Sequence, residues 1–340
     1  MTAPALPATF ADAVALLGTA RTPADVFGDD THVGLHIYRQ LAKILHPDRA
    51  PADRADTATA AFARLTALWA ARHGDPVTVD SRKRSYTLGP LVAAGDLADL
   101  YDVEVDGSPA LFKIARSPVN NDLVEREAVA LRRLHAEGDE RHRAYVPELH
   151  DAFTLREAGT GVRRVITVTS RATGFVSLAE VRDAYPAGLD PRDAAWMWRR
   201  LLVALGFAHR AGVVHGAVLP DHVLIHPAAH GLALVDWCYS GGDGDPVPAI
   251  VSRYRDWYPP EVLSRKAPGP GTDIHLASRC VAALMGRAAP APLTRFIRGC
   301  TLTSVAARPD DAWQVLRDLD ALLERLYGPR TFRPFAMPST

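Results

Sequence analysis

Between residues 215 and 222 the chain reads His215-Gly216-Ala217-Val218-Leu219-Pro220-Asp221-His222. A long helix is predicted before this stretch, because Asp190-Pro191 is a typical helix start and Gly212 a typical helix stop. After it come two short apolar runs, residues 223–225 and 232–235, which are predicted to be strands around a turn. The sequence thus predicts a loop held between a helix and two strands.

This stretch resembles the catalytic loop of protein kinases, H-R-D-L-x-x-x-N, in which the Asp accepts the proton of the substrate hydroxyl and the Asn holds a metal ion. His215 keeps the histidine of the pattern, but Ala217 and His222 occupy the places of the Asp and the Asn. Loss of a general base typically costs about 10²- to 10⁴-fold in rate. The resemblance therefore implies a kinase fold that has lost its catalytic pair, that is, a pseudokinase.

Later residues extend the same resemblance. Asp236-Trp237-Cys238 stands where kinases have D-F-G, and Tyr258-Pro259-Pro260-Glu261 resembles the A-P-E segment. Asp273 is at the position of the aspartate that braces the catalytic loop, and Arg308 at that of the arginine that pairs with the A-P-E glutamate. Residues from about 80 to 327 resemble a protein-kinase fold in order and spacing, which implies a bilobal α+β architecture. The retained Asp236 is implied to hold a divalent cation bound to phosphates.

His222 and Cys238 each leave alternatives open. Imidazole prefers softer ions than magnesium, so His222 restores a metal site only for a metal such as manganese or zinc; the simpler interpretation is a structural hydrogen bond. Cys238 replaces a glycine, which restricts the backbone there, and no cationic neighbour in the sequence predicts a lowered thiol pKa.

The stretch before the loop contains a second candidate site. A hairpin is predicted with its turn at Asp106-Gly107, and its second strand carries Lys113 between two apolar residues. Lys113 with Glu127 on the following predicted helix resembles the V-A-I-K lysine and its glutamate partner. The resemblance implies ATP with Mg²⁺ as the ligand of Lys113, Glu127 and Asp236. The alternative is an exposed lysine on an ordinary sheet.

The glycine-rich loop of kinases is poorly matched here. When the pattern G-x-G-x-x-G is aligned on this chain, Gly95 is its only glycine, flanked by Ala93 and Ala98. A methyl group limits how closely backbone amides approach a phosphate, so nucleotide binding is predicted to be weakened and is left open.

The N-terminal region shows a different pattern. Tyr38, Leu41 and Leu45 share one helical face, while Arg39 and Lys43 form a cationic stripe on another. That helix is predicted to end at His46-Pro47-Asp48, because a residue before proline is pushed out of the helical region. A second helix follows, with Phe62, Leu65 and Trp69 at helical spacing.

These two segments, Tyr38 to Arg49 and Ala61 to Trp69, resemble the J domain of DnaJ-type co-chaperones. The resemblance implies docking onto a DnaK-type heat-shock chaperone, with His46, Pro47 and Asp48 triggering ATP hydrolysis and Arg39 and Lys43 meeting acidic chaperone surface. The alternative is a helix-ending turn with a capping aspartate. The long segment before the basic helix departs from the family pattern.

The amino-acid composition limits which classes of partner are expected. The 340 residues carry 39 Lys and Arg against 39 Asp and Glu, so no global basic field favours nucleic acid or anionic membrane. Cys238, Cys280 and Cys300 lack the paired spacing of metal sites or disulfide frameworks and are predicted to be buried thiols. No stretch has the length of a signal peptide or membrane span, and we expect a cytoplasmic protein.

The sequence therefore predicts a J domain at residues 1–75, a linker or edge strand at 76–85, a kinase-like N-lobe at 86–176, a C-lobe at 177–327 and an extended tail at 328–340. The favoured interpretation is a co-chaperone adaptor whose pseudokinase recognises an unidentified client or partner. One alternative is a divergent serine/threonine-type kinase or other phosphotransferase targeted by its J domain. A third is scaffolding by two inert modules.

Overall fold

The computed structural model of this chain describes residues 7, 9–28, 31–46, 54–72, 77–95, 97–156, 161–241 and 244–338. The chain forms two compact units and passes between them more than once. One unit contains Met1–Glu125 and His150–Ser170, and the other contains Arg126–Leu149 and Arg171–Thr340.

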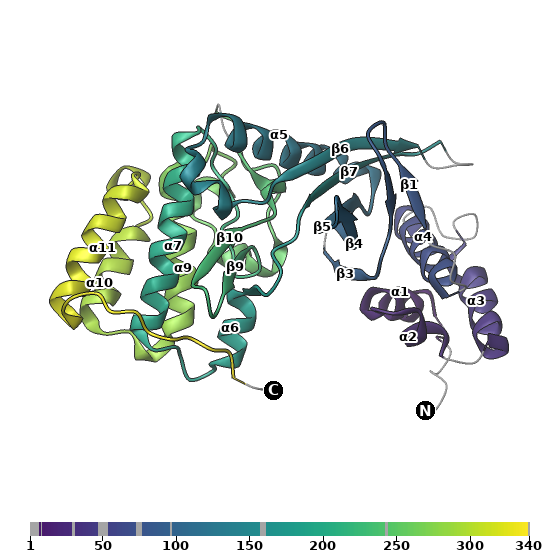
Figure 1. Cartoon of the computed structure of the whole chain (residues 1–340), viewed down its shortest axis with the longest axis horizontal. Coiled ribbons are helices and arrows are strands. Elements are labelled where there is room, and N and C mark those ends of the chain that lie inside the picture. Colours follow the sequence, from purple (N-terminus) through teal and green to yellow (C-terminus); the bar gives the residue numbers. More distant parts are fainter. Residues whose placement is uncertain are drawn as a thin grey trace. The chain divides into compact units, whose positions relative to one another are not determined.

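The first unit begins with helices (Figure 1). They are α1 (Phe10–Thr19), α2 (Pro23–Phe27), α3 (Thr31–Leu45) and α4 (Ala55–Arg72). They enclose an apolar cluster in which Leu41, Leu45 and Leu65 are fully buried, and the rings of Tyr38 and Trp69 stack with centroids 4.6 Å apart. The predicted helical faces are thus the ones that form the core, and α3 ends one residue before His46, as the following proline predicts.

The rest of this unit is β structure. Its strands are β1 (Thr78–Asp80), β2 (Ser85–Thr87), β3 (Leu91–Ala94), β4 (Ala98–Val105), β5 (Ser108–Ala115), β6 (Leu149–Arg156) and β7 (Arg163–Ser170). A five-stranded sheet has the order β3-β4-β5-β7-β6, and β5 pairs antiparallel with both β4 and β7. The predicted hairpin turn is confirmed, with Asp106 and Gly107 at φ 52° and 77°. Both values are in the left-handed region that a two-residue hairpin turn requires.

The stretch predicted as a linker or edge strand, residues 76–85, contains strand β1 and the first residue of β2. Strands β1 and β2 pair with each other, and the run Arg82-Lys83-Arg84 lies in the turn between them. The Ser81 hydroxyl closes this turn by accepting from the backbone N–H groups of Lys83 and Arg84 at 3.0 and 3.1 Å. Such side-chain to backbone bonds compete with strand pairing, which explains why the polar run turns instead of extending.

The second unit is mainly helical. Its helices and strands are α5 (Asn121–Glu137, shared with the first unit), β8 (Val176–Ser177), α6 (Leu178–Ala184), α7 (Pro191–Arg210), β9 (Val223–His226), β10 (Gly231–Leu234), α8 (Pro260–Leu263), α9 (Pro270–Met285), α10 (Ala291–Cys300) and α11 (Ala312–Tyr327), and its short 3-10 helices include η5 (Trp237–Tyr239) and η6 (Ser252–Trp257). Helix α7 is capped by Asp190 and packs against α9 and α11 (Figure 1). Strands β9 and β10 pair antiparallel after the 215–222 loop, as predicted. Cys238, Cys280 and Cys300 are buried, also as predicted, and none of the three forms a disulfide.

The tail after α11 lies extended against the second unit. Arg333 pairs with Asp190 and Asp193 at 3.4 and 3.1 Å, and the Tyr185 hydroxyl donates to the carbonyl of Ala336 at 2.8 Å. Phe335 is buried against this surface. The tail is therefore fastened by the buried Phe335 side chain and by several polar contacts.

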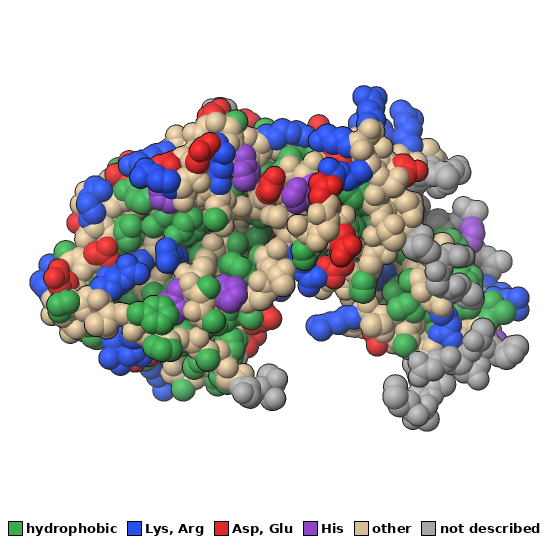
Figure 2. All heavy atoms as spheres, in the orientation of Figure 1, with side chains coloured by type: hydrophobic (Ala, Val, Ile, Leu, Met, Phe, Trp, Pro, Cys, Tyr) green, Lys and Arg blue, Asp and Glu red, His purple; other side chains and the backbone are tan. Residues whose placement is uncertain are grey.

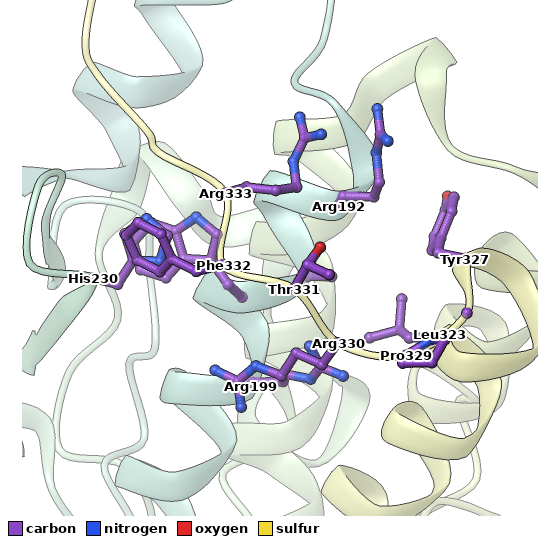
Figure 3. Close-up of a pocket in the computed structure, with 13 residues that line it drawn as sticks. Arg192, Arg199, His230, Leu323, Tyr327, Pro329, Arg330, Thr331, Phe332 and Arg333 are labelled. Carbon is purple, nitrogen blue, oxygen red and sulfur yellow. The ribbon is translucent and has the colours of Figure 1, made fainter.

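A cavity of about 360 Å³ lies where the tail crosses α7 and the end of α11 (Figure 3). Trp196, His230 and Phe332 form a stack of rings beside it, with successive centroids 4.1 and 4.6 Å apart. Arg192 and Arg199 come from α7, and Arg330 and Arg333 come from the tail. Three of these four arginines pair with the aspartates Asp190, Asp193 and Asp320, which offsets most of their charge.

Figure 2 shows basic and acidic side chains intermixed over the face in view, in keeping with the equal numbers of the two kinds. No helix within the described part of the chain is long and apolar enough to cross a membrane.

Candidate functional site

The loop 215–222 is held from beneath by a buried aspartate of α9. Asp273 is fully buried and accepts the backbone N–H of His215 at Oδ2 and that of Gly216 at Oδ1, both at 2.8 Å. His209 Nε2 lies 3.0 Å from the same carboxylate. The contact predicted for Asp273 is therefore present in the structure.

His215 is a buried, neutral part of this loop. Its Nδ1 accepts the Ala217 N–H at 3.2 Å, and its Nε2–H donates to the Val235 carbonyl at 3.0 Å. Burial lowers the pKa of His215 to about 4, because an imidazolium would lose its hydration there. The ring therefore joins the loop to the end of β10 and carries no charge at neutral pH.

Ala217 and His222 contact each other at the two altered positions. Ala217 is fully buried, and its carbonyl accepts from His222 Nδ1 at 2.8 Å. The other ring nitrogen, Nε2, lies 3.2 Å from Asp236 Oδ2. A chain of contacts thus runs from Ala217 through the His222 ring to Asp236.

Asp236 has the left-handed backbone conformation, φ 64° and ψ 57°, and its side chain is 26% exposed. Oxygen atoms of Asp236 and Glu127 and the sulfur of Cys238 all lie within 4.8 Å of one another. Glu127 and Cys238 are buried. The kinase resemblance implied one site for Glu127 and Asp236 and did not include Cys238. The signal for Cys238 was a thiol at a glycine position two residues after Asp236.

Asp221, the carboxylate nearest to Ala217 in sequence within this loop, makes other contacts. Its Oδ2 accepts from the Tyr254 hydroxyl at 2.5 Å and pairs with Arg253 at 3.0 Å. Burial and this hydrogen bond raise the pKa of Tyr254 to about 12, so the phenol keeps its proton. Asp221 is therefore tied to η6 and is not positioned by these contacts as a substitute for the missing aspartate.

The pair predicted from the A-P-E resemblance is also present. Arg308 Nη2 lies 2.5 Å from Glu261 Oε1, with both side chains buried. The Thr272 hydroxyl donates to the same oxygen at 3.0 Å. Two hydrogen bonds to one buried carboxylate oxygen fix the start of α8 on α9.

Gly95 and Lys113 lie in the first unit. Lys113 is buried in β5, opposite Leu100 of β4 and Thr167 of β7. The Gly95 N–H donates to the Ala98 carbonyl at 2.9 Å, so this amide closes the β3–β4 turn instead of remaining open for a phosphate. Glu127 and Asp236 lie in the second unit.

The residues present do not fit Mg²⁺ as the counter-ion of ATP. Magnesium takes oxygen ligands in near-octahedral geometry. Of the two places that hold metal in the kinase pattern, Asp236 keeps its carboxylate, whereas His222 offers a nitrogen that already faces this carboxylate at 3.2 Å. ATP with Mg²⁺ at Lys113, Glu127 and Asp236 stays a prediction.

The structure describes three of the five residues that are predicted to bind a chaperone. Arg39 and Lys43 are exposed on α3, as the cationic stripe requires. His46 follows the helix, half-buried, with its ring 5.3 Å from that of Phe62. Pro47 and Asp48 lie outside the described residues.

Comparison with known proteins supports the architecture. No family model matches the chain. Casein kinase II subunit alpha' of Saccharomyces cerevisiae (strain ATCC 204508 / S288c) is 36% identical over 58 residues, and this match spans only 17% of either protein. The crystal structure of the BubR1 kinase domain superposes with a TM-score of 0.57, at 12% identity, over 74% of this chain and 83% of that chain. The chain therefore has an α+β protein-kinase-like fold over most of its length, preceded by a helical N-terminal region.

Proposed function

We propose that this protein is an adaptor. Its N-terminal helical region recruits a DnaK-type chaperone and stimulates the chaperone's ATPase, and its kinase-like domain recognises a client or partner without transferring phosphate. The observation that carries the proposal is the contact chain of Ala217, His222 and Asp236, which fills the place where a kinase needs a base and a metal ligand.

The absence of transfer follows from the chemistry of these side chains. A methyl group cannot accept the proton of a hydroxyl, and loss of a general base costs about 10²- to 10⁴-fold in rate. Besides Asp236, the carboxylates of Asp221 and Asp273 are already engaged, Asp221 by Tyr254 and Arg253, and Asp273 by backbone amides. What remains is a hydrogen-bonded frame that is suited to binding.

Chaperone recruitment is supported by the helical region. Helices α3 and α4 pack through their apolar faces, which leaves Arg39 and Lys43 exposed on α3. His46 comes directly after this basic helix. A cationic helix with an adjacent histidine suits an acidic partner surface.

Chaperone ATPase measurements test this half of the proposal. We expect the full chain to raise the steady-state ATP hydrolysis of a DnaK-type chaperone and His46→Gln to abolish the increase. His36→Gln, on an exposed position of the same helix, is the matched control and should keep full stimulation. Equal stimulation by the His46 variant and the unaltered protein would contradict the proposal.

A divergent phosphotransferase is the second candidate, because the buried pair of Glu261 and Arg308 and the brace at Asp273 are intact. Labelled phosphate transfer that is lost on Asp236→Asn would favour this candidate over the adaptor. Thermal unfolding with and without ATP and Mg²⁺ tests the pocket separately, since a ligand at about 100 times its Kd adds about 2.7 kcal/mol to the native state. Lys113→Ala is the control for that shift.

A further inference from the structure

Four side chains of the second unit present metal-binding atoms to one another. One carboxylate oxygen each from Glu127 and Asp236 and the sulfur of Cys238 lie mutually within 4.8 Å. His222 Nε2 is 3.2 Å from Asp236 Oδ2. These side chains come from three segments: Glu127 from α5, His222 from the end of the 215–222 loop, and Asp236 and Cys238 from the segment after β10.

The orientation of His222 is informative. The Ala217 carbonyl can only accept a hydrogen bond, so Nδ1, at 2.8 Å from it, carries the hydrogen. In a neutral ring Nε2 then presents its lone pair to the Asp236 carboxylate, which is also an acceptor. Two acceptors 3.2 Å apart require a positive centre between them, either a proton or a metal ion.

The same arrangement is typical of metal-ligating histidines. Such a ring usually donates its other N–H to a carboxylate or a backbone carbonyl, which fixes the ring and its tautomer. Here the Ala217 carbonyl has this role, and it is available because the loop backbone is held by Asp273. The bond between His222 and the Ala217 carbonyl and the cluster of candidate ligand atoms are independent observations, and both are typical of a metal site.

The distances also agree with a tetrahedral ion. Zinc bonds of about 2.0–2.1 Å to nitrogen and oxygen and about 2.3 Å to sulfur separate neighbouring ligand atoms by about 3.3–3.5 Å. The 3.2 Å between His222 and Asp236 is close to this value, and the 4.8 Å limit for the other three atoms requires shifts of about 1 Å. A set of one sulfur, one nitrogen and two oxygens selects zinc or cobalt over magnesium.

We propose that Glu127, His222, Asp236 and Cys238 form a site for a transition-metal ion of the zinc type, in place of the magnesium site that a kinase fold implies. Binding releases the Cys238 thiol proton to solvent. The partly exposed Asp236 side chain provides the entry route, while Glu127 and Cys238 close the inner side. Glu127, Asp236 and Cys238 also make other polar contacts, so the ion competes with these.

The metal would link α5 to the segment that follows β10. Its occupancy would therefore set the position of α5 within the second unit. This inference does not depend on chaperone recruitment, and its test uses no ATPase or transfer activity.

The experiment is a Co²⁺ and Zn²⁺ titration of the full chain. We expect Co²⁺ to produce a thiolate-to-cobalt charge-transfer absorption in the near ultraviolet and Zn²⁺ to displace it. Cys238→Ser should abolish this absorption and weaken Zn²⁺ binding by at least about tenfold, measured by competition with a chromogenic chelator. Cys280→Ser removes another buried thiol and should leave both signals unchanged.

His222→Gln provides a second ligand variant in case Cys238→Ser does not fold, and thermal unfolding identifies the folded variants. It should weaken Zn²⁺ binding while keeping some thiolate absorption. Absence of the absorption in the unaltered protein, or its persistence in folded Cys238→Ser, would overturn the proposal. The first result would assign a shared proton to His222 and Asp236; the second would place the metal elsewhere.

Discussion

Replacing Gly216 by alanine should destabilise the second unit by about 2–5 kcal/mol. Gly216 has φ 75°, where a residue with a side chain loses about 1–2 kcal/mol. The added Cβ would also lie 2.7 Å from the backbone oxygen of Tyr239 and 3.2 Å from Val247 Cγ2. Relieving that overlap requires the backbone to move, and such overpacking typically costs about 1–3 kcal/mol.

The assay is urea unfolding of the full chain, supported by calorimetry. For a domain of 150–250 residues each 1 kcal/mol lowers the midpoint by roughly 2–4 °C, so a fall of about 4–20 °C is expected. Gly328→Ala is the control that distinguishes the cost of backbone strain from the cost of steric overlap. Gly328 has φ 76°, but no heavy atom lies within 4 Å of the added Cβ. With ψ at −166° as well, Gly328→Ala should lose about 1–3 kcal/mol through backbone strain alone. If Gly216→Ala lost no more than this control, the steric reasoning would be refuted.

The overlap at Gly216 also limits attempts to rebuild the kinase motif in this loop. Kinases have arginine at this place of the loop, but an arginine here would meet the same overlap with Tyr239. A carboxylate at Ala217 would enter a fully buried position. The kinase motif therefore cannot be rebuilt by local substitution without repacking the loop.

Three further predictions concern stability. Arg308→Met should destabilise the protein by about 3–5 kcal/mol in urea unfolding because it leaves Glu261 buried without its cation, and adding Glu261→Gln should restore part of the loss. Folding lowers the pKa of His215 from 6.5 to about 4, so the unfolded state binds more protons than the folded state between these pH values. The free energy of unfolding should therefore be at its full value above about pH 6.5 and fall by roughly 3 kcal/mol as the pH drops towards 4. In a folded His215→Gln variant this fall should be less steep. Phe335→Ala should cost about 1.5–3 kcal/mol and accelerate proteolysis of the tail, whereas Phe332→Ala, at an exposed position, should have a smaller effect on stability.

Local patterns in the sequence predicted the frame of the site well. The turn at Asp106-Gly107, the strands after the 215–222 loop and the bracing by Asp273 and Arg308 follow from residue types whose roles are local or positionally fixed in a kinase-like fold. The helical faces around Leu41 and Leu65 follow from spacing alone.

Other features depend on packing between distant segments, which local sequence patterns do not report. Cys238 meets Glu127 because α5 packs near the segment after β10, and Asp221 meets Tyr254 because η6 returns to the loop. The turn at Arg82-Lys83-Arg84 is closed by the Ser81 hydroxyl, whose bonds to backbone N–H groups compete with strand pairing.

The placement of β7 has a consequence for biosynthesis. Strand β5 pairs with β4 on one side and with β7 on the other, but roughly 50 residues, including α5, separate β5 from β7 in the chain. At a translation rate of about 5–20 residues per second, one edge of β5 stays unpaired for about 3–10 s before β7 is synthesised. Through that interval the nascent chain presents an open strand edge with Phe112 and Ile114, the kind of segment that aggregates unless it is covered.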